Sequence, residues 1–407
     1  MALKKLGLLM LTILLVLSGC LPILQPPNDN NSIEDDPTVE DVDVGVIPSI
    51  SSPEDYYRSI LYDGTYPHGE ARGVGTGQLA NRIDLDQFEL GLTRIAQEFF
   101  PSERYFFREG QFLRQAEVES WISRETENNP NGLNPSIDRL SNNEMEGMSE
   151  DEIVQVSRGR EEEDPSYLSH LLEHNYLVES SEGKYEVGGI VIGLSLKDTF
   201  RYRVTFPDGR FHVFSHELNH EEVLEQGKEA AEKVLQRLRS DGREDGAFNQ
   251  IPIVFALFQE QPPQSAIPGN FVAHAKAEPN GGLSGWQTIN EQYYLFPSTE
   301  ANRDVRGDAD AFNLLREDIQ DFFSTYVGVV GRAFYNNENL QELTIDVSLQ
   351  YQGKTEIIAI SQFIASRITQ RFPESLKVNV YLESASGKQE AMIIRSPNSE
   401  PELHINQ

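Results

Sequence analysis

Cysteine is almost missing from this chain of 407 residues, because Cys20 is the only one. A single cysteine cannot form an intramolecular disulfide, so the fold must be stabilised by its apolar core. Lys and Arg are also scarce: 34 residues against 65 Asp and Glu, which gives a formal net charge of −31. This excess of acid argues against nucleic acid as a partner, since that binding relies on basic side chains that neutralise phosphates. It argues equally against membrane attachment through a basic patch.

A long hydrophobic run is missing as well. The apolar stretch Leu6–Leu17 is shorter than the ~20 residues that a transmembrane helix needs. It follows Lys4 and Lys5 and leads into small residues, which is the layout of a secretory signal peptide. We therefore predict a signal peptide over residues 1–19 rather than an uncleaved membrane anchor.

The end of this segment, Leu17-Ser18-Gly19-Cys20, resembles the lipobox of bacterial lipoproteins. In such proteins the cysteine thiol receives a diacylglyceryl group, and the lipoprotein-processing signal peptidase cuts just before the cysteine. The resemblance implies cleavage between Gly19 and Cys20. It also implies attachment to the cell membrane, on its extracytoplasmic face, through the acyl chains on Cys20.

Residues 20–55 are predicted to be a disordered acidic tether that follows the lipidated cysteine. This segment is rich in Pro and Asn, contains no Lys or Arg, and carries its acids between Asp29 and Asp55. Such a composition cannot bury enough apolar surface to fold alone. A flexible coil of this length spans on the order of 30 Å, which would hold a folded body away from the membrane.

The next part, residues 56–180, is predicted to be mainly helical. Apolar residues recur at helical spacing over 86–100, and a shorter helix is expected over 117–123. The segment 149–164 begins with Ser149 and has Glu152 three residues later, which is a capping box. A further amphipathic helix is expected over 165–177.

Residues 186–300 and 301–407 each predict a β-α-β-type unit that forms part of a mixed sheet. The first unit reads as a strand over 186–197, a helix over 221–240 and a buried strand over 251–261, with a hairpin over 198–215 that turns at Pro207-Asp208-Gly209. The second unit has a helix over 308–327 and then reads strand, helix, strand over 342–384. The predicted fold class is therefore α+β, and the two units suggest an internal repeat.

One segment invites a metal-site interpretation. HELNH, residues 216–220, fits H-E-x-x-H, in which a helix presents two histidines to zinc and the glutamate is the general base. The helix that follows is predicted to begin near residue 219 or 220, because the next two residues are glutamates and acids favour the first turn. His216 would then precede the helix, and the i, i+4 geometry would be lost. We therefore predict no metal site at His216, Glu217 and His220, and a zinc metallopeptidase is the remote alternative.

No other motif predicts catalysis or a cofactor. RGVGTGQ, residues 72–78, contains G-x-G-x-G but lacks the flanking strand and helix of a nucleotide-binding loop, so we interpret it as a flexible loop. No serine has a G-x-S-x-G context. We expect the protein not to be an enzyme.

Several segments of the body match a known family. They include YYRSIL at 56–61, FELGLTRIAQEFFPSERYFFREGQFL at 88–113, QGKEAAEKVLQRLR at 226–239, IPGNFVAHAKAE at 267–278 and DVSLQYQGKTEIIAISQF at 346–363. On these segments the chain resembles the CamS family of sex pheromone lipoproteins of Gram-positive bacteria. The resemblance covers most of residues 56–395.

In that family the end of the signal peptide can be trimmed and released as a hydrophobic peptide, which cells carrying conjugative plasmids sense. The equivalent stretch here is Thr12–Gly19, or the shorter Ile13–Gly19. The resemblance assigns no activity to the folded body, for which we expect a binding or interaction role with a partner that the sequence does not identify. The alternative is a solute-binding lipoprotein that serves a transporter, which would have two similar α/β lobes around a cleft.

Overall fold

The structure is a computed structural model. It describes residues 45–46, 56–62, 64–74, 79, 81–180, 184–240, 243–322, 327–350 and 353–406. The predicted signal peptide, the lipobox with Cys20, and the tether apart from Gly45 and Val46 lie outside the described residues. Residues Val39–Gln407 form one compact unit.

Helices and runs of consecutive strands are interspersed along the described part. The helices are α2 (Arg82–Gln97), α3 (Gln115–Ile122), α4 (Glu150–Glu163), α5 (His220–Leu238), the 3₁₀ helix η2 (Glu244–Asn249), α6 (Thr299–Asp304), α7 (Arg306–Phe322) and α8 (Lys354–Arg371). The strands are β1 (Gly45–Val46), β2 (Leu61–Tyr62), β3 (Phe106–Glu109), β4 (Leu168–Glu179), β5 (Tyr185–Leu196), β6 (Thr199–Thr205), β7 (Phe211–Glu217), β8 (Ile253–Gln259), β9 (Asn270–Ala277), β10 (Leu283–Thr288), β11 (Glu291–Phe296), β12 (Gly328–Asn336), β13 (Asn339–Leu349), β14 (Lys377–Ser384), β15 (Gln389–Arg395) and β16 (Glu402–Ile405).

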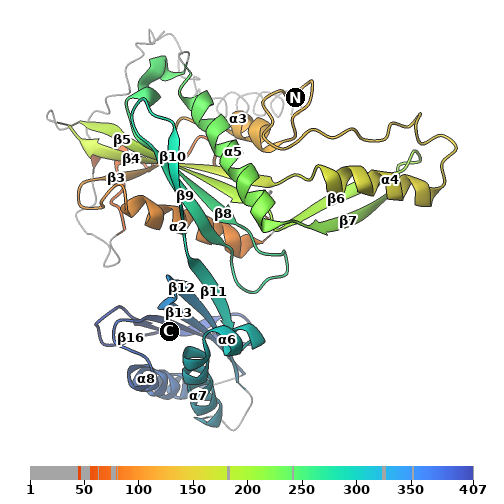
Figure 1. Ribbon diagram of the computed structural model, residues 1–407. Coiled ribbons are helices and arrows are strands. Elements are labelled where there is room, and N and C mark those ends of the chain that lie inside the picture. The colour runs from red at the N-terminus through yellow and green to blue at the C-terminus, as the bar shows by residue number, and fades with distance from the viewer. Residues whose placement is uncertain are drawn as a thin grey trace, which may run out of the picture. The chain divides into compact units, whose positions relative to one another are not determined.

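The N-terminal sheet has six strands in the order β10-β9-β8-β5-β4-β3. Its neighbouring strands are antiparallel except for β5 and β8, which are parallel and joined through α5. Alternate residues point to opposite faces, so Ile192 and Phe255 pack with the α5 side of the core, whereas Val191 and Val254 pack with the α2 side. Helices therefore cover both faces, as Figure 1 shows for α5 and α2.

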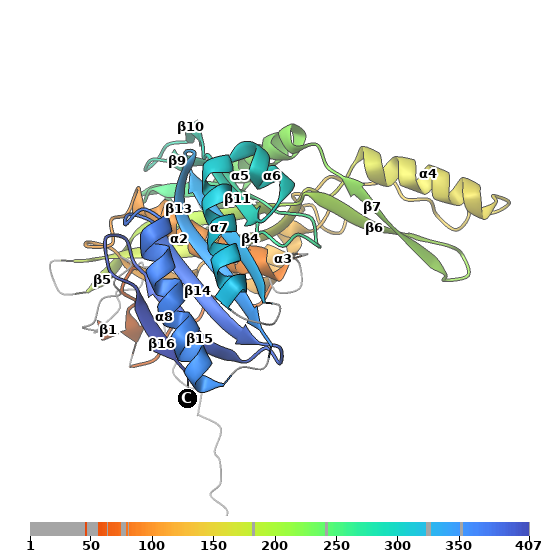
Figure 2. The ribbon, with the colours of Figure 1, turned by 90° about the horizontal axis from the view of Figure 1, so that it is seen from below.

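The C-terminal sheet also has six strands, in the order β11-β12-β13-β14-β15-β16. Again the central pair, β13 and β14, is parallel and joined by a helix, α8, while the other pairs are antiparallel. The apolar residues of α7 and α8 form one buried cluster with this sheet, and Figure 2 shows the two helices side by side on it.

The two sheets thus share one topology: two antiparallel pairs, a central parallel pair with a helical crossover, and two more antiparallel pairs. A parallel pair requires such a crossover because its strands run in the same direction. The α+β fold class and both β-α-β-type units are confirmed. Whether the units arose by duplication stays a prediction.

Local sequence signals explain where several elements begin and turn. The Ser149 side chain accepts from the Glu152 amide, and the Glu152 carboxylate accepts from the Ser149 amide, so the predicted capping box of α4 is confirmed. The predicted hairpin is β6 and β7, paired from Thr199 with Glu217 to Thr205 with Phe211. Gly209 takes φ +86° at its turn, a conformation that glycine adopts without steric cost.

The predicted helix over 165–177 is wrong. Residues 168–179 form β4, an inner strand between β3 and β5. Its side chains are buried on both faces, so the strand lacks the alternation of apolar and polar residues that reveals a strand at a surface. The leucines of a doubly buried strand fall at spacings that also fit a helix. The described parts of residues 56–180 contain α2, α3 and α4 together with β2, β3 and β4.

None of the helices in the described part of the chain combines the length and the apolar character that crossing a bilayer requires.

Candidate functional site

The N-terminal sheet is wider than the helix on its α2 face. A helix is about 10 Å across and strands lie ~4.8 Å apart, so one helix covers roughly two or three of six strands. α2 packs on β5, β8 and β9, which leaves the β3 and β4 edge of this face to other parts of the chain. A cavity of about 360 Å³ lies there, between α2, β3, β4 and residues 66–73. We call it the α2–β4 pocket.

One wall of the α2–β4 pocket is the turn after β3, and Glu173 of β4 holds it. The Glu173 carboxylate accepts from the amide of Leu113 at 2.7 Å and from that of Phe112 at 3.1 Å. The Gly110 amide donates to the Glu173 carbonyl at 3.0 Å. A Cβ at Gly110 would lie 2.5 Å from the Glu173 Cβ, so no other residue fits there without moving the wall.

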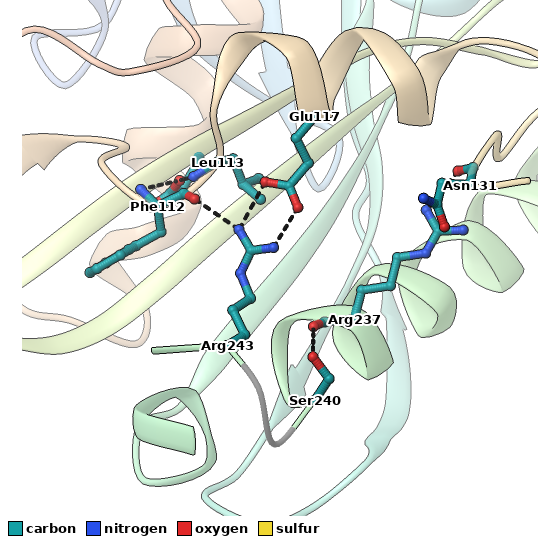
Figure 3. Close-up of polar contacts among 8 residues, drawn as sticks. Phe112, Leu113, Glu117, Asn131, Arg237, Ser240 and Arg243 are labelled. Carbon is teal, nitrogen blue, oxygen red and sulfur yellow. Dashed lines mark hydrogen bonds and ion pairs between the residues drawn. The ribbon is translucent and has the colours of Figure 1, made fainter. Parts of the chain in front are cut away.

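The same wall is fixed from its other side by Arg243. Its guanidinium donates to the Phe112 carbonyl at 2.8 Å and to both carboxylate oxygens of Glu117 on α3, at 2.5 and 2.9 Å. Figure 3 shows Arg243 reaching Glu117 and the backbone at Phe112. A guanidinium paired in this two-point way gives both attraction and fixed geometry. The wall is therefore held in place before any ligand arrives.

Two buried histidines of β4 form the floor of the α2–β4 pocket. His170 is 3 % exposed and His174 5 % exposed, and both line the cavity. Burial lowers the pKa of His170 to about 4 and that of His174 to about 3, so both rings are neutral at neutral pH. His174 makes an edge contact with Phe107, with ring centroids 4.9 Å apart. The Nδ1 atom of His170 has no hydrogen-bond partner among the described residues.

Acidic side chains lie at the α2 and β3 side of the pocket. Burial, together with Asp86 and Glu109, raises the pKa of Glu89, while Arg72 opposes the shift. Glu109 accepts from the Gly69 amide at 2.6 Å. Burial and this Glu109 carboxylate raise the pKa of Tyr66. A positively charged ligand group would relieve the mutual repulsion of the two glutamates.

The lining combines apolar walls with a few converging polar groups, which is typical of small-molecule sites. The apolar part includes Leu85, Leu90, Phe107, Leu113 and Leu172. Among the described residues that line the cavity none is a serine or a cysteine, the usual side-chain nucleophiles of acyl transfer. The arrangement can bind and orient a ligand through carboxylates and a neutral imidazole.

The residues of the predicted zinc alternative do not come together. His216 and Glu217 are at the end of β7, and His220 is the first residue of α5. His220 Nε2 lies 3.2 Å from Asp198, whereas His216 Nδ1 faces Glu162 at 3.9 Å. The prediction that His216 precedes the helix is confirmed. Within the described ranges there is no group of three or more potential ligand side chains arranged around a metal position.

The other predicted site residues, Leu17, Ser18, Gly19 and Cys20, lie outside the described residues. Sequence reasoning missed the α2–β4 pocket. One signal was present: SHLLEHNYL, residues 169–177, places two histidines and a glutamate within an apolar run, and a buried polar residue is more informative than an exposed apolar one. The glycine loop at 72–78 was interpreted only as a flexible connection, yet Arg72 and Gly73 line the pocket.

The comparisons with known proteins agree on one family. The family model described as "CamS sex pheromone cAM373 precursor" matches residues 66–401. No curated protein matches the chain.

Two solved structures are similar to the chain over most of its length. A sex pheromone precursor from Lactobacillus salivarius subsp. salivarius UCC118 is 27 % identical with a TM-score of 0.77, and the match covers 89 % of this chain and 99 % of that one. The C-terminal domain of the sex pheromone staph-cAM373 precursor from Staphylococcus aureus is 26 % identical with a TM-score of 0.64, covering 81 % and 99 %.

Proposed function

Since the chain belongs to the CamS family of sex pheromone precursors, we propose that it is a lipid-anchored protein of the extracytoplasmic membrane face with two roles. Its signal segment is the source of a hydrophobic peptide, and its folded body binds a small ligand in the α2–β4 pocket. The observation that carries the binding role is the buried Nδ1 of His170, which has no hydrogen-bond partner in the described part of the chain and lies beside an acidic, apolar-walled cavity.

The anchor proposal rests on Cys20, the single cysteine, at the end of a lipobox-like segment. Two acyl chains hold a protein stably at a membrane where one does not. Mass spectrometry of the membrane-extracted protein should find Cys20 as the first residue, with a diacylglyceryl group on its thiol. The variant Cys20→Ser should keep its signal segment. An intact Met1 on the wild-type protein, or a bare thiol at Cys20, would contradict the anchor.

The peptide proposal concerns Thr12–Gly19, an uncharged and mostly aliphatic stretch that ends in two small residues. The names of the two similar solved proteins support it, since both are called sex pheromone precursors. Synthetic Thr12–Gly19 at nanomolar concentration should make plasmid-carrying responder cells clump or raise plasmid transfer. A peptide of the same composition in reversed order is the control. Equal responses to both peptides, or none to either, would rule the peptide out as a signal.

For the folded body we propose a ligand with an ammonium group on an apolar chain. The ammonium would meet Glu89 and Glu109, and the apolar part would lie against Leu85, Leu90 and Leu172. One hydrogen-bonding group of the ligand would reach Nδ1 of His170. A ligand of the opposite charge is disfavoured, because the lining holds three glutamates against one arginine.

Hexylamine is a simple probe of this chemistry, with hexanoate as its matched control of opposite charge. A ligand that binds only the folded state raises the melting temperature. Hexylamine should raise it for the wild-type chain, and hexanoate should not. The shift should disappear in Leu172→Trp, which fills the cavity, and in Glu109→Gln, but persist in Glu402→Gln on the exposed β16. Equal shifts with hexanoate, or no effect of Leu172→Trp, would show that the pocket is not the site.

A narrower form of this role is the solute-binding lipoprotein of a transporter. The shared strand order of the two sheets fits the two similar α/β lobes expected of such proteins, while the α2–β4 pocket lies within one of them and not in a cleft between them. Uptake of labelled hexylamine by cells should then fall when the gene is deleted and return with the wild-type gene but not with the Leu172→Trp gene. Unchanged uptake in the deletion strain would remove the transporter role and leave the binding role untouched.

A further inference from the structure

A second cavity, also of about 360 Å³, lies along β6 in the hairpin that interrupts the crossover of the N-terminal sheet. Its walls are β6 from Phe200 to Thr205, residues 137–145 before α4, and one side of α4. In Figures 1 and 2 α4 lies along the hairpin. We call this cavity the β6 groove.

The β6 groove follows an unpaired strand edge. Among the described strands, β6 pairs with β7 alone, in a two-stranded sheet. The Phe206 amide donates to the Arg210 carbonyl at 2.8 Å, and inward and outward backbone groups alternate along an antiparallel pair. The amides and carbonyls of Thr205, Arg203 and Arg201 therefore face away from β7. No described residue makes a backbone hydrogen bond to them.

The β6 groove is basic in a chain whose net charge is −31. Four arginines line it, Arg139, Arg160, Arg201 and Arg203, against the single acid Glu161. The Glu161 carboxylate is already neutralised by ion pairs, since Arg139 and Arg124 both donate to it.

Two of these arginines have unused charge. Within the described residues, Arg201 and Arg203 form no ion pair, and Arg203 lies 4.2 Å from the Phe211 ring centroid. Both side chains belong to the residues whose backbone groups point outward. The two positive charges therefore stand on the exposed face of β6, beside an edge whose backbone hydrogen bonds are open.

We propose that the β6 groove binds an acidic segment of a partner protein, in extended conformation, as a third strand on the free edge of β6. Strand addition uses the outward amides and carbonyls for affinity and alternate side chains for specificity. Carboxylates at every second position would meet Arg201 and Arg203. The residues between them would lie against the buried Met145 and the half-buried Leu140.

Two other occupants fit less well. A second copy of this chain that paired β6 with β6 would place the arginines of both copies close to one another, and like charges on facing strands are destabilising. A bilayer surface would use the two arginines but offers no row of carbonyls and amides to pair with the free strand edge.

The test uses the purified full chain and a fluorescein-labelled, acetylated heptapeptide that alternates Asp and Val. Fluorescence anisotropy should show saturable binding that weakens as salt rises. A heptapeptide that alternates Lys and Val is the charge control and should not bind. No binding of the acidic peptide, or equal binding of both, would overturn the proposal.

Two proline variants separate strand addition from simple charge attraction. Thr205→Pro removes an outward amide from the β6 edge, and Ser215→Pro removes one from the opposite edge of the same hairpin, since β7 follows the same alternation. Both residues are exposed and uncharged. Thr205→Pro should weaken peptide binding at least about tenfold, while Ser215→Pro should leave it within about twofold. Equal losses in the two variants would overturn strand addition.

The double variant Arg201→Ala with Arg203→Ala changes only exposed side chains and keeps the backbone. It should weaken peptide binding at least about tenfold and reduce its dependence on salt. Self-association, followed by sedimentation, and binding to phosphatidylglycerol vesicles are measured with the same variants. Self-association or vesicle binding that depends on these arginines, without peptide binding, would assign the edge to another occupant and overturn the proposal.

Discussion

The two six-stranded sheets share a strand order but differ in what their connections carry. In the N-terminal sheet the central crossover contains the β6–β7 hairpin before α5, and α3 and α4 lie between β3 and β4. In the C-terminal sheet the crossover is α8 alone, and α6 and α7 connect β11 to β12. The α2–β4 pocket and the β6 groove both belong to the first arrangement. The comparison teaches that the shared topology supplies a scaffold, while the segments added to it form the two cavities: residues 66–97 before β3, and the longer connections.

The two regions can be monitored separately in one experiment. The sequence has two tryptophans, and Trp121 of α3 and Trp286 of β10 both belong to the N-terminal region. Tryptophan fluorescence therefore follows that region, whereas circular dichroism follows both.

The largest effect is expected from Arg395→Leu in the C-terminal region. Arg395 is 1 % exposed, and its guanidinium donates to the carbonyls of Ile368, Phe372, Pro373 and Leu376 at 2.7–3.3 Å. Removing it leaves buried carbonyls at the end of α8 without a partner, which should cost about 3–5 kcal/mol of unfolding free energy. In urea, circular dichroism should lose signal well before the fluorescence changes. A simultaneous shift of both signals would show that the two regions unfold together.

The second-largest expected effect is the loss of stability of the N-terminal region at acidic pH. Unfolded histidine has a pKa near 6.5, but burial lowers the folded pKa of His170 to about 4. Between these values the unfolded state binds the proton and the folded state does not, so stability falls as pH drops from about 6.5 to 4. For His170 the loss should reach up to about 3 kcal/mol.

The variant His170→Phe should remove that part of the acid sensitivity, measured by urea unfolding with tryptophan fluorescence at several pH values. The C-terminal region offers the internal control, since its single histidine, His404, is exposed. A wild-type chain and a His170→Phe chain with the same pH dependence would contradict the prediction.

A matched pair of glycines gives an intermediate effect. A Cβ on Gly193 of β5 would lie 2.7 Å from the Phe88 ring of α2, and one on Gly331 of β12 would lie 2.6 Å from the Phe312 ring of α7. In each sheet the glycine makes room for a phenylalanine of the covering helix. Gly193→Val and Gly331→Val should each cost about 1–3 kcal/mol through overpacking. Fluorescence should report the first variant and not the second. Equal shifts of the fluorescence-detected unfolding transition in both variants would contradict the assignment of each glycine to its own region.

The smallest effects come from hairpin turns with open surroundings. Gly209, between β6 and β7, and Gly387, between β14 and β15, have φ of +86° and +79°, and no atom lies within 4 Å of an added Cβ at either position. Alanine at either site should therefore cost only the conformational strain, about 1 kcal/mol. Gly159→Ala on α4, which also meets open space, should instead stabilise the chain by about 0.5–1 kcal/mol. Thermal unfolding of the three variants checks the opposite signs.

Much of the fold could be predicted because its signals are local. The start of α4 follows from Ser149 and Glu152, and the hairpin turn follows from Gly209. The buried strand β8 was evident from its continuous apolar run, IVFALFQ. By contrast β4 was predicted as a helix, since only its neighbours β3 and β5 make it a strand, and they are brought to it by the fold.

The candidate site was less predictable for a related reason. Glu109, His170 and Glu173 are more than 60 residues apart at the extremes, and they meet only because β3 pairs with β4. The sequence shows each as one polar residue in an apolar segment, which a surface position would also explain. The burial of His170 and Glu173, and the lack of a partner for His170 Nδ1 among the described residues, follow from tertiary packing that the local sequence does not encode.

The short pairing of β1 with β2 would be the first contact to bear a load applied through the proposed anchor. Under the proposed anchor at Cys20, a pull on the body would pass first to Gly45 and Val46, which pair with Tyr62 and Leu61. So short a pairing is marginally stable on its own and yields at low force. Opening of this pairing would lengthen the connection to the proposed anchor before either six-stranded sheet bears the load.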